Sequence, residues 1–370
     1  MPLVEILLYC FIFIVVIQLA YYGFIYGKLA SFKPTTPNQK NIGISVLVCA
    51  KNEADNLTKN IPQLLNQTYP KFEIVLINDD STDETLSIMK AFQSKSDLIK
   101  LVDVKPIEKF WGNKKYALTL GIKAATYDYL LFTDADCTPL SEDWISEMSK
   151  HFSNEKSIVI GYSPYCKIKN SLLNLLIRFE TFMTGVQYFS YALIGIPYMA
   201  VGRNLAYKKA LFFEANGFMN HMDLKSGDDD LFVNQVATKK NIELCISNKA
   251  FTESAPKTNF KDWIRQKRRH ISTAKHYKSQ HKILLGLFYL SQLSFWILGI
   301  ALIISLFQWE LVLTLILIRF SVQYISLIGC AKKLDDVHLM IWLPVLEFLL
   351  ILIQFFIFIQ NLISKPKHWK

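Results

Sequence analysis

Residues 42–78 read IGISVLVCAKNEADNLTKNIPQLLNQTYPKFEIVLIN, with two apolar runs on either side of a more polar segment. The runs IGISVLVCA and FEIVLIN are rich in Val and Ile and show no polar alternation, which is typical of strands buried on both faces. Between them, NLTKNIPQLLNQ spaces its apolar residues as a helix does. A strand, a helix and a strand in this order predict two parallel strands with the helix packed across them.

The same alternation continues along the chain as far as residue 134. STDETLSIMKAF contains a capping box that predicts a helix beginning near Ser81, while LIKLVDV and DYLLFTD predict strands with the helix KKYALTLGIKAA between them. The predicted fold class is therefore α/β, with a Rossmann-like and mostly parallel sheet. Ligands of such sheets bind beyond the carboxyl ends of the strands.

Both ends of the chain are apolar over lengths that suit a membrane. Residues 3–26 carry one charged side chain, Glu5, and lack the cleavage site of a signal peptide. Residues 283–307 carry no charge, residues 311–331 carry Arg319 alone, and residues 339–363 carry Glu347 alone. We predict an anchor over 1–27, a soluble-type domain over 28–282 and a membrane region over 283–370. Because ionised groups are costly inside a bilayer, Arg319 and Glu347 are expected to pair.

The charge distribution predicts the side on which the domain lies. The formal net charge is +10, and Lys28, Lys33, Lys332 and Lys333 flank the apolar segments on the side of the domain. By the positive-inside rule we expect the domain to be cytoplasmic. We predict an integral protein of a bacterial type of inner membrane. Four spans would put the basic tail SKPKHWK on the other side. The alternative is that the last segment, which Pro344 interrupts, is re-entrant.

Two further segments of the domain are expected at the membrane surface. The aromatic stretch of about residues 171–200 and the basic stretch of about 258–280 are both predicted to be interfacial helices. Binding to anionic lipid explains the excess of basic residues more simply than binding to nucleic acid, because no nucleic-acid-binding motif is present. The six cysteines lack CxxC spacing, which argues against a zinc site or a disulfide framework.

Acidic pairs follow two of the predicted strands. Asp79 and Asp80 follow FEIVLIN, and Asp134 and Asp136 follow DYLLF, so both pairs face one edge of the sheet. Two carboxylates that flank a tight turn can bind one hard cation, and Mg2+ or Mn2+ then completes its shell with phosphate oxygens. An isolated DxD is more often a solvated turn, but a second acidic pair nearby favours a metal site.

Five motifs in order give the chain a family resemblance. SVLVCAKNEADNL, INDDSTDET, TDADC, SGDDDLF and QKRRH, within residues 42–270, resemble the membrane-bound inverting glycosyltransferases of family 2, which include cellulose, hyaluronan and ceramide glycosyltransferases. The resemblance implies a GT-A fold, a divalent metal and a nucleotide-diphosphate sugar, usually UDP-linked. The expected acceptor is a lipid or lipid-linked glycan in cell-surface glycolipid or polysaccharide assembly. The rival hypotheses are a processive synthase that secretes its polymer and a non-enzymatic membrane scaffold or transporter with a decayed domain.

The resemblance also assigns roles on the donor side, residue by residue. The base and ribose would lie among Cys49, Ala50, Asn52 and Glu53. Asp80 would accept a hydrogen bond from N3 of uracil, and Lys114 would bind the diphosphate. Asp134 would contact ribose or metal, and Asp136 the metal.

On the acceptor side the resemblance implies a base and a set of polar contacts. Asn204 would touch the sugar, and Asp229, or in another register Asp228, would take the proton of the acceptor hydroxyl. Gln266, Arg269 and His270 of QKRRH would lie beside the acceptor and the diphosphate. The family usually has Trp where this chain has His270, and this departure favours addition of a single sugar over polymer synthesis.

Overall fold

The centre of the domain is a seven-stranded sheet in the order β3-β2-β1-β4-β7-β6-β8. The computed structural model describes residues 3–34, 37–105, 114–224 and 226–364. Four neighbouring strands are parallel, namely β3 (Ile99–Val104), β2 (Phe72–Asp79), β1 (Ile44–Ala50) and β4 (Tyr129–Asp134). The strand β7 (Leu205–Lys208) runs antiparallel to its neighbours β4 and β6 (Ile158–Ile160), and β8 (Ile242–Leu244) pairs with β6 in parallel.

Helices cover both faces of this sheet, as the continuous apolar runs predict. Along β1, Leu47 packs into one core with α5 (Lys114–Ala124), whereas Val46 and Val48 pack into another with α3 (Ala54–Leu65) and α4 (Thr85–Gln93). The predicted α/β fold with a mostly parallel sheet is thus confirmed. The remaining helices of the domain are α6 (Trp144–Lys150), α8 (Lys209–Glu214), α9 (Asp230–Val236) and α10 (Phe260–Ile271).

The predicted capping box at Ser81 is wrong. The helix α4 begins at Thr85, and its amide donates to Oδ1 of Asp83 at 3.0 Å. The hydroxyl of Ser81 instead accepts from the amide of Asn52 at 3.1 Å. Ser81 therefore joins the loop after β1 to the loop after β2.

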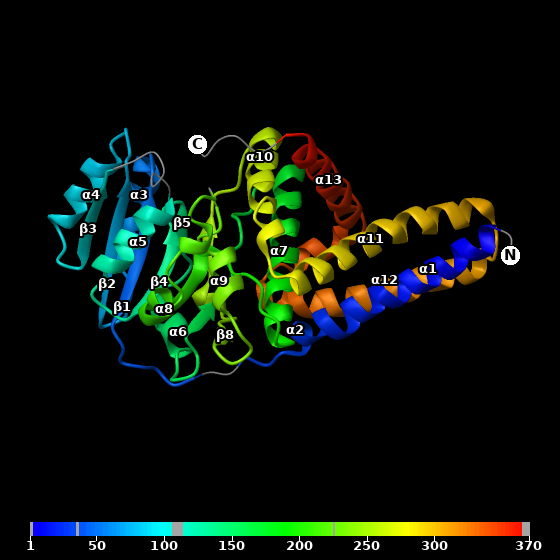
Figure 1. Cartoon of the computed structure of the whole chain (residues 1–370), viewed down its shortest axis with the longest axis horizontal. Coiled ribbons are helices and arrows are strands. Elements are labelled where there is room, and N and C mark those ends of the chain that lie inside the picture. Colours follow the sequence, from blue (N-terminus) through cyan, green and yellow to red (C-terminus); the bar gives the residue numbers. More distant parts are fainter. Residues whose placement is uncertain (1–2, 35–36, 106–113, 225, 365–370) are drawn as a thin grey trace.

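Long apolar helices extend from the domain (Figure 1). The first consists of α1 (Leu3–Leu19), a π-helical segment (Ala20–Tyr26) and α2 (Gly27–Ser31), and it packs against α11 (Ser279–Ser305) and α12 (Trp309–Leu334). We call these helices the bundle. The last apolar segment is a 3-10 helix, η6 (Val337–Trp342), followed by α13 (Leu343–Ile363). Within the described residues, the N-terminal helix, α11, α12 and the segment Val337–Ile363 are long and apolar enough to cross a membrane.

The predicted pairing of Arg319 with Glu347 is confirmed. Both side chains are buried, and Nη2 of Arg319 lies 2.5 Å from Oε1 of Glu347, with Nη1 at 2.9 Å from Oε2. Polar side chains from the neighbouring helices complete the cluster. Those that bond to Arg319 or Glu347 are Gln18, Tyr22, Gln292 and Gln323. The cluster thus joins the bundle to α13.

The segment predicted at the membrane surface near residues 171–200 forms a helix that is largely buried within the protein. In α7 (Leu172–Leu193), 15 of the 22 residues are buried. The helix stands between the domain and the apolar helices, where it contacts β8, α2, α12 and α13 (Figure 1). Its Arg178 pairs with Asp336, just before η6. The polar residues of α7 therefore meet protein partners, which is why its composition resembled that of an interfacial helix.

The buried pair predicts a specific response to substitution. Arg319→Ala leaves Glu347 buried without its cation, so we expect a loss of about 3–5 kcal/mol in the free energy of unfolding. The double variant Arg319→Met, Glu347→Leu should lose less than either single alanine variant, because neither charge remains. Thermal unfolding of the full chain in detergent measures the stability of the single and double variants. Ser321→Ala, at an exposed position of the same helix, is the matched control and should change little. An unchanged melting temperature for both Arg319→Ala and Glu347→Ala would contradict the prediction.

Candidate active site

Lys114 joins the DxD turn to the acidic triplet at residues 228–230. Its Nζ donates to Oδ1 of Asp134 at 2.8 Å and lies 3.0 Å from Oδ2 of Asp228. The two acids come from different parts of the chain, since Asp134 ends β4 and Asp228 lies just before α9. Although burial opposes ionisation, the ion pair with Lys114 keeps the pKa of Asp228 below its usual range. The predicted donor and acceptor residues therefore share one site.

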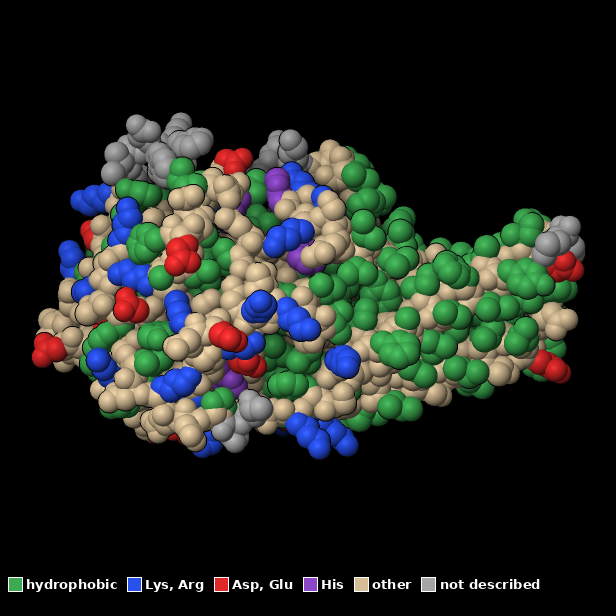
Figure 2. All heavy atoms as spheres, turned by 60° about the horizontal axis from the view of Figure 1, so that its bottom comes forward, with side chains coloured by type: hydrophobic (Ala, Val, Ile, Leu, Met, Phe, Trp, Pro, Cys, Tyr) green, Lys and Arg blue, Asp and Glu red, His purple; other side chains and the backbone are tan. Residues whose placement is uncertain are grey.

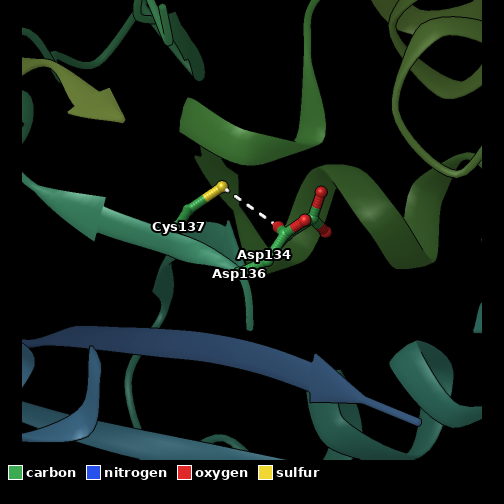
Figure 3. Close-up of side chains that lie close together, drawn as sticks. All are labelled: Asp134, Asp136 and Cys137. Carbon is green, nitrogen blue, oxygen red and sulfur yellow. Dashed lines mark hydrogen bonds between the residues drawn. The ribbon is translucent and has the colours of Figure 1, made fainter. Parts of the chain in front are cut away.

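Asp134 and Asp136 form an acidic pair that fits a divalent cation. One oxygen from each and the sulfur of Cys137 lie within 4.8 Å of one another (Figure 3). Burial, together with Asp134 and Glu53, raises the pKa of Asp136, so a cation at this point would favour its ionised form. The sulfur of Cys137 lies 2.9 Å from the hydroxyl oxygen of Ser254. Burial raises the pKa of the Cys137 thiol well above its usual range. Mg2+ or Mn2+ would thus have two carboxylate ligands, because these ions prefer oxygen to a neutral thiol.

The three aspartates at residues 228–230 lie in different environments. Oδ2 of Asp229 accepts from the amide of Gly202 at 2.6 Å, and Oδ1 accepts from the amide of Asp230 at 2.7 Å. Burial and its acidic neighbours Asp228 and Asp230 raise the pKa of Asp229 to about 7. Asp230 faces away from the site and accepts from Thr273 at 2.5 Å and Tyr277 at 2.6 Å. Asp229 thus has the protonation behaviour of a base that works near neutral pH.

The turn before β7 supports the site through a glycine and an asparagine. A Cβ at Gly202 would lie 3.2 Å from Oδ2 of Asp229, so glycine lets this carboxylate approach the backbone. Asn204 is 0% exposed, and its amide bonds with Trp144, Tyr162 and Ala250. The prediction that Asn204 touches the sugar is therefore wrong, because its polar atoms are used to hold the turn.

Arg203 was missed although it lies between two residues that were singled out. Its guanidinium stands over the ring of Tyr165 at 4.4 Å and donates to Ser254 at 3.2 Å. Although burial opposes its charge, its acidic neighbours, which include Tyr165, Asp136 and Asp134, raise the pKa of Arg203 above its usual range. A cation within the apolar stretch before β7 was the available signal. Arg203 therefore places a positive charge between Asp136 and the strand β9 (Thr252–Ser254).

Lys115 was missed as well, because a second lysine beside Lys114 resembled surface charge. It is 2% exposed and donates to the carbonyls of His221, Leu224 and Ser226, each at 2.7 Å. Burial lowers its pKa to about 8. Lys115 thereby holds the loop that leads into the triplet.

The predicted nucleotide-binding residues lie at the carboxyl ends of β1 and β2. Cys49 borders a cavity of about 20 Å³ together with Lys114 and Asp134, whereas Ala50 is buried. Oδ1 of Asn52 accepts from the amide of Thr82 at 2.8 Å, which ties the two loops together. Glu53 accepts from Asn56 at 2.6 Å, and Asp80 is exposed with φ of 51°. These loops form the edge at which ligands of such sheets bind.

The basic helix α10 closes the site from the side of the apolar helices. Nε2 of Gln266 donates to the hydroxyl of Tyr165 at 3.4 Å, so Gln266 reaches the acidic pair through Tyr165 and Arg203. Arg269 and His270 lie side by side, with Nη2 of Arg269 3.4 Å from Nε2 of His270. Although His270 reaches the surface, desolvation of its ring and the nearby cations lower its pKa well below the usual range. His270 is therefore a neutral ring beside a cation.

Sequence comparisons place the domain among sugar-transferring proteins. Residues 45–213 match the family model described as Glycosyl transferase family 2. A poly-beta-1,6-N-acetyl-D-glucosamine synthase of Staphylococcus epidermidis is 33% identical over 156 residues, or 41% of this chain and 36% of the relative. A protein of the same name from Staphylococcus aureus is 32% identical over 132 residues, or 35% and 31%. The match thus spans about a third of the length of these curated relatives.

A solved structure resembles nearly the whole chain. A mannosyltransferase from Pyrobaculum calidifontis, in complex with GDP-Man and Mn2+, aligns with a TM-score of 0.60 over 90% of this chain and 99% of its own. The sequences are 19% identical, so the likeness concerns the fold. Together with the family model, it agrees with the order of motifs and the sheet described above. Residues 45–213 are therefore similar to the glycosyltransferases of family 2, and the chain shares the GT-A type of fold.

Proposed function

We propose that the protein transfers a sugar, with inversion, from a nucleotide-diphosphate sugar to a lipid or lipid-linked glycan at a membrane. The observation that carries the proposal is the contact of Lys114 with both Asp134 and Asp228, at 2.8 and 3.0 Å. A scaffold with a decayed domain would have no reason to keep these three charged side chains together. The convergence supports an intact transfer site.

The donor would bind along the carboxyl ends of β1, β2 and β4. Asp80 would accept from N3 of uracil, with Cys49, Ala50, Asn52 and Glu53 around the base and ribose. Lys114 would bind the donor diphosphate. Asp134 and Asp136 would hold Mg2+ or Mn2+, which supplies positive charge against the diphosphate as it departs. The named product of the staphylococcal relatives makes UDP-N-acetylglucosamine the first donor to test.

Asp229 would remove the proton of the acceptor hydroxyl. Its carboxylate is held by the amides of Gly202 and Asp230, so its position does not depend on a bound ligand. Asp228 suits this role less, because Lys114 holds its charge in an ion pair. As the base takes the proton, the hydroxyl oxygen attacks the anomeric carbon from the face opposite the leaving diphosphate, which inverts the configuration.

The acceptor would arrive along the membrane. The helix α10, with Gln266, Arg269 and His270, lies between the site and the apolar helices (Figure 1). The basic residues Lys28, Lys332 and Lys333 lie at the domain end of the bundle, which supports a cytoplasmic domain at an inner membrane. His270 replaces the aromatic platform expected of a polymer channel, so we propose addition of a single sugar.

Product length tests the proposal directly. Purified protein with radiolabelled UDP-N-acetylglucosamine and lipid extract should give one labelled species that partitions into organic solvent. Parallel reactions with other UDP-sugars and with GDP-mannose identify the donor. A ladder of products would support the processive synthase instead. Absence of transfer and of donor hydrolysis with every nucleotide sugar would favour the non-enzymatic alternative.

The acidic pair predicts metal-dependent donor binding. Mn2+ with a UDP-sugar should raise the melting temperature of the full chain, because a ligand that binds only the native state stabilises it. Asp136→Ala should abolish most of this increase. Asp97→Ala, which removes an exposed acid near β3, is the control and should retain it. An equal increase in both variants would exclude Asp136 as a metal ligand.

The raised pKa of Asp229 predicts the pH dependence of transfer. Because a base works only when it is ionised, kcat/KM should fall as the pH is lowered through about 7. Asp229→Asn should reduce kcat by about 10²-fold or more. If Asp229→Asn keeps its activity while Asp228→Asn loses it, Asp228 is the base. A wild-type profile that is flat down to pH 5 would also contradict the assignment to Asp229.

A further inference from the structure

The apolar segment Val337–Ile363 begins on the domain side of the bundle. Asp336, directly before it, accepts from the hydroxyl of Tyr162 at 2.9 Å and pairs with Nη2 of Arg178 at 2.5 Å. Tyr162 follows β6 in the domain, and Arg178 lies in α7, which stands against the domain. All three side chains are buried. The start of the segment is therefore fixed to the domain.

The other end of the segment returns to the same side. Arg268 of α10 donates to the side chain of Asn361 at 2.9 Å and to the carbonyl of Ser364 at 2.6 Å. A straight helix of the 27 residues from Val337 to Ile363 would be about 40 Å long and would hold its ends on opposite faces of a bilayer. Here both ends contact parts of the domain.

The segment reverses its direction between these two ends. It turns where η6 ends and α13 begins, and Pro344 lies at the start of α13. Shortly after the turn, Glu347 reaches Arg319 in the interior of α12, so this part lies deepest along the bundle. From there α13 runs obliquely away from the bundle and ends beside α10 (Figure 1).

The outer face of α13 is apolar and exposed. Apolar side chains of α13 that are at least 45% exposed include Val345, Leu352, Phe355, Phe356, Phe358 and Leu362. Glu347 is the single charged residue of α13 in the sequence, and it is buried. Figure 2 shows hydrophobic side chains covering the bundle up to the domain, where basic side chains begin. In α10, Lys261 and Arg265 are exposed, and Arg268 of the same helix bonds to the end of α13.

We propose that η6 and α13 form a re-entrant hairpin whose exposed face lies among the acyl chains of the leaflet next to the catalytic domain. The bundle then crosses the membrane through the N-terminal helix, α11 and α12, and α13 ends at Ile363 on the side of the domain. The occupant of the apolar face is lipid, because the face adjoins the lipid-exposed bundle and ends at cationic side chains that match anionic head groups. The inference rests on the bundle crossing a membrane and not on sugar transfer.

Tag accessibility on the full chain distinguishes the two topologies. One tag precedes Met1, one follows Lys370, and a third is inserted at Phe307 in the turn between α11 and α12. In sealed vesicles of one orientation, the tags at Met1 and Phe307 should be on one side, and the tag after Lys370 on the other. Three tags on the same side would mean that α13 crosses the membrane and would overturn the proposal.

Photocrosslinking identifies what covers α13. A benzophenone amino acid replaces Phe356, which is 50% exposed in α13, or Phe213, which is 46% exposed in α8 of the domain. In native membranes the probe at Phe356 should crosslink phospholipid several-fold more than the probe at Phe213. Crosslinking of Phe356 to a second copy of the chain or to another protein, in place of lipid, would overturn the docking of this face in the leaflet. Equal lipid crosslinking at the two positions would overturn it as well.

Discussion

The ion pairs of Lys114 with Asp134 and Asp228 are the contacts on which the site depends. Bringing carboxylates from β4 and from the start of α9 close together is unfavourable unless a cation lies between them. Lys114 supplies that charge from the first residue of α5. The same contact separates the roles of neighbouring acids. Asp228, paired with the lysine, has a lowered pKa, whereas Asp229, one residue later, has a raised one.

The site is also connected to the apolar helices through hydrogen-bonded carboxylates. Asp230 bonds to Thr273 and Tyr277, just before α11, and Asp336 bonds to Tyr162 and Arg178 after α12. A movement of the segment that enters α11 would therefore act on α9, which begins at the triplet. This physical link fits the proposed transfer to a membrane acceptor, since Asp229, the proposed base, lies directly beside Asp230.

Several features of the site could be predicted from residue types and order. The acids after β4 were predicted because they follow a buried apolar run, whereas the acids before α9 and the basic helix α10 were predicted from motifs that resemble a known family. Lys115 and Arg203 were not found, since a lysine beside a lysine and an arginine beside a glycine resemble solvated surface. Asn204 was misassigned because a motif shows which residue is present but not where its amide points. In the structure that amide is satisfied by Trp144, Tyr162 and Ala250.

The sequence by itself determined the alternation of strands and helices, the parallel sheet and the apolar helices, because burial on both faces and the thickness of a bilayer leave direct patterns in residue order. It also determined that Arg319 and Glu347 need each other, since charges in an apolar segment are costly. The tertiary structure alone decided that α7 is buried and that the last apolar segment returns to the domain. Length and hydropathy describe how much apolar surface a helix has, whereas its direction depends on the partners of its two ends. Those partners, Arg178 and Arg268, lie far from it in the sequence.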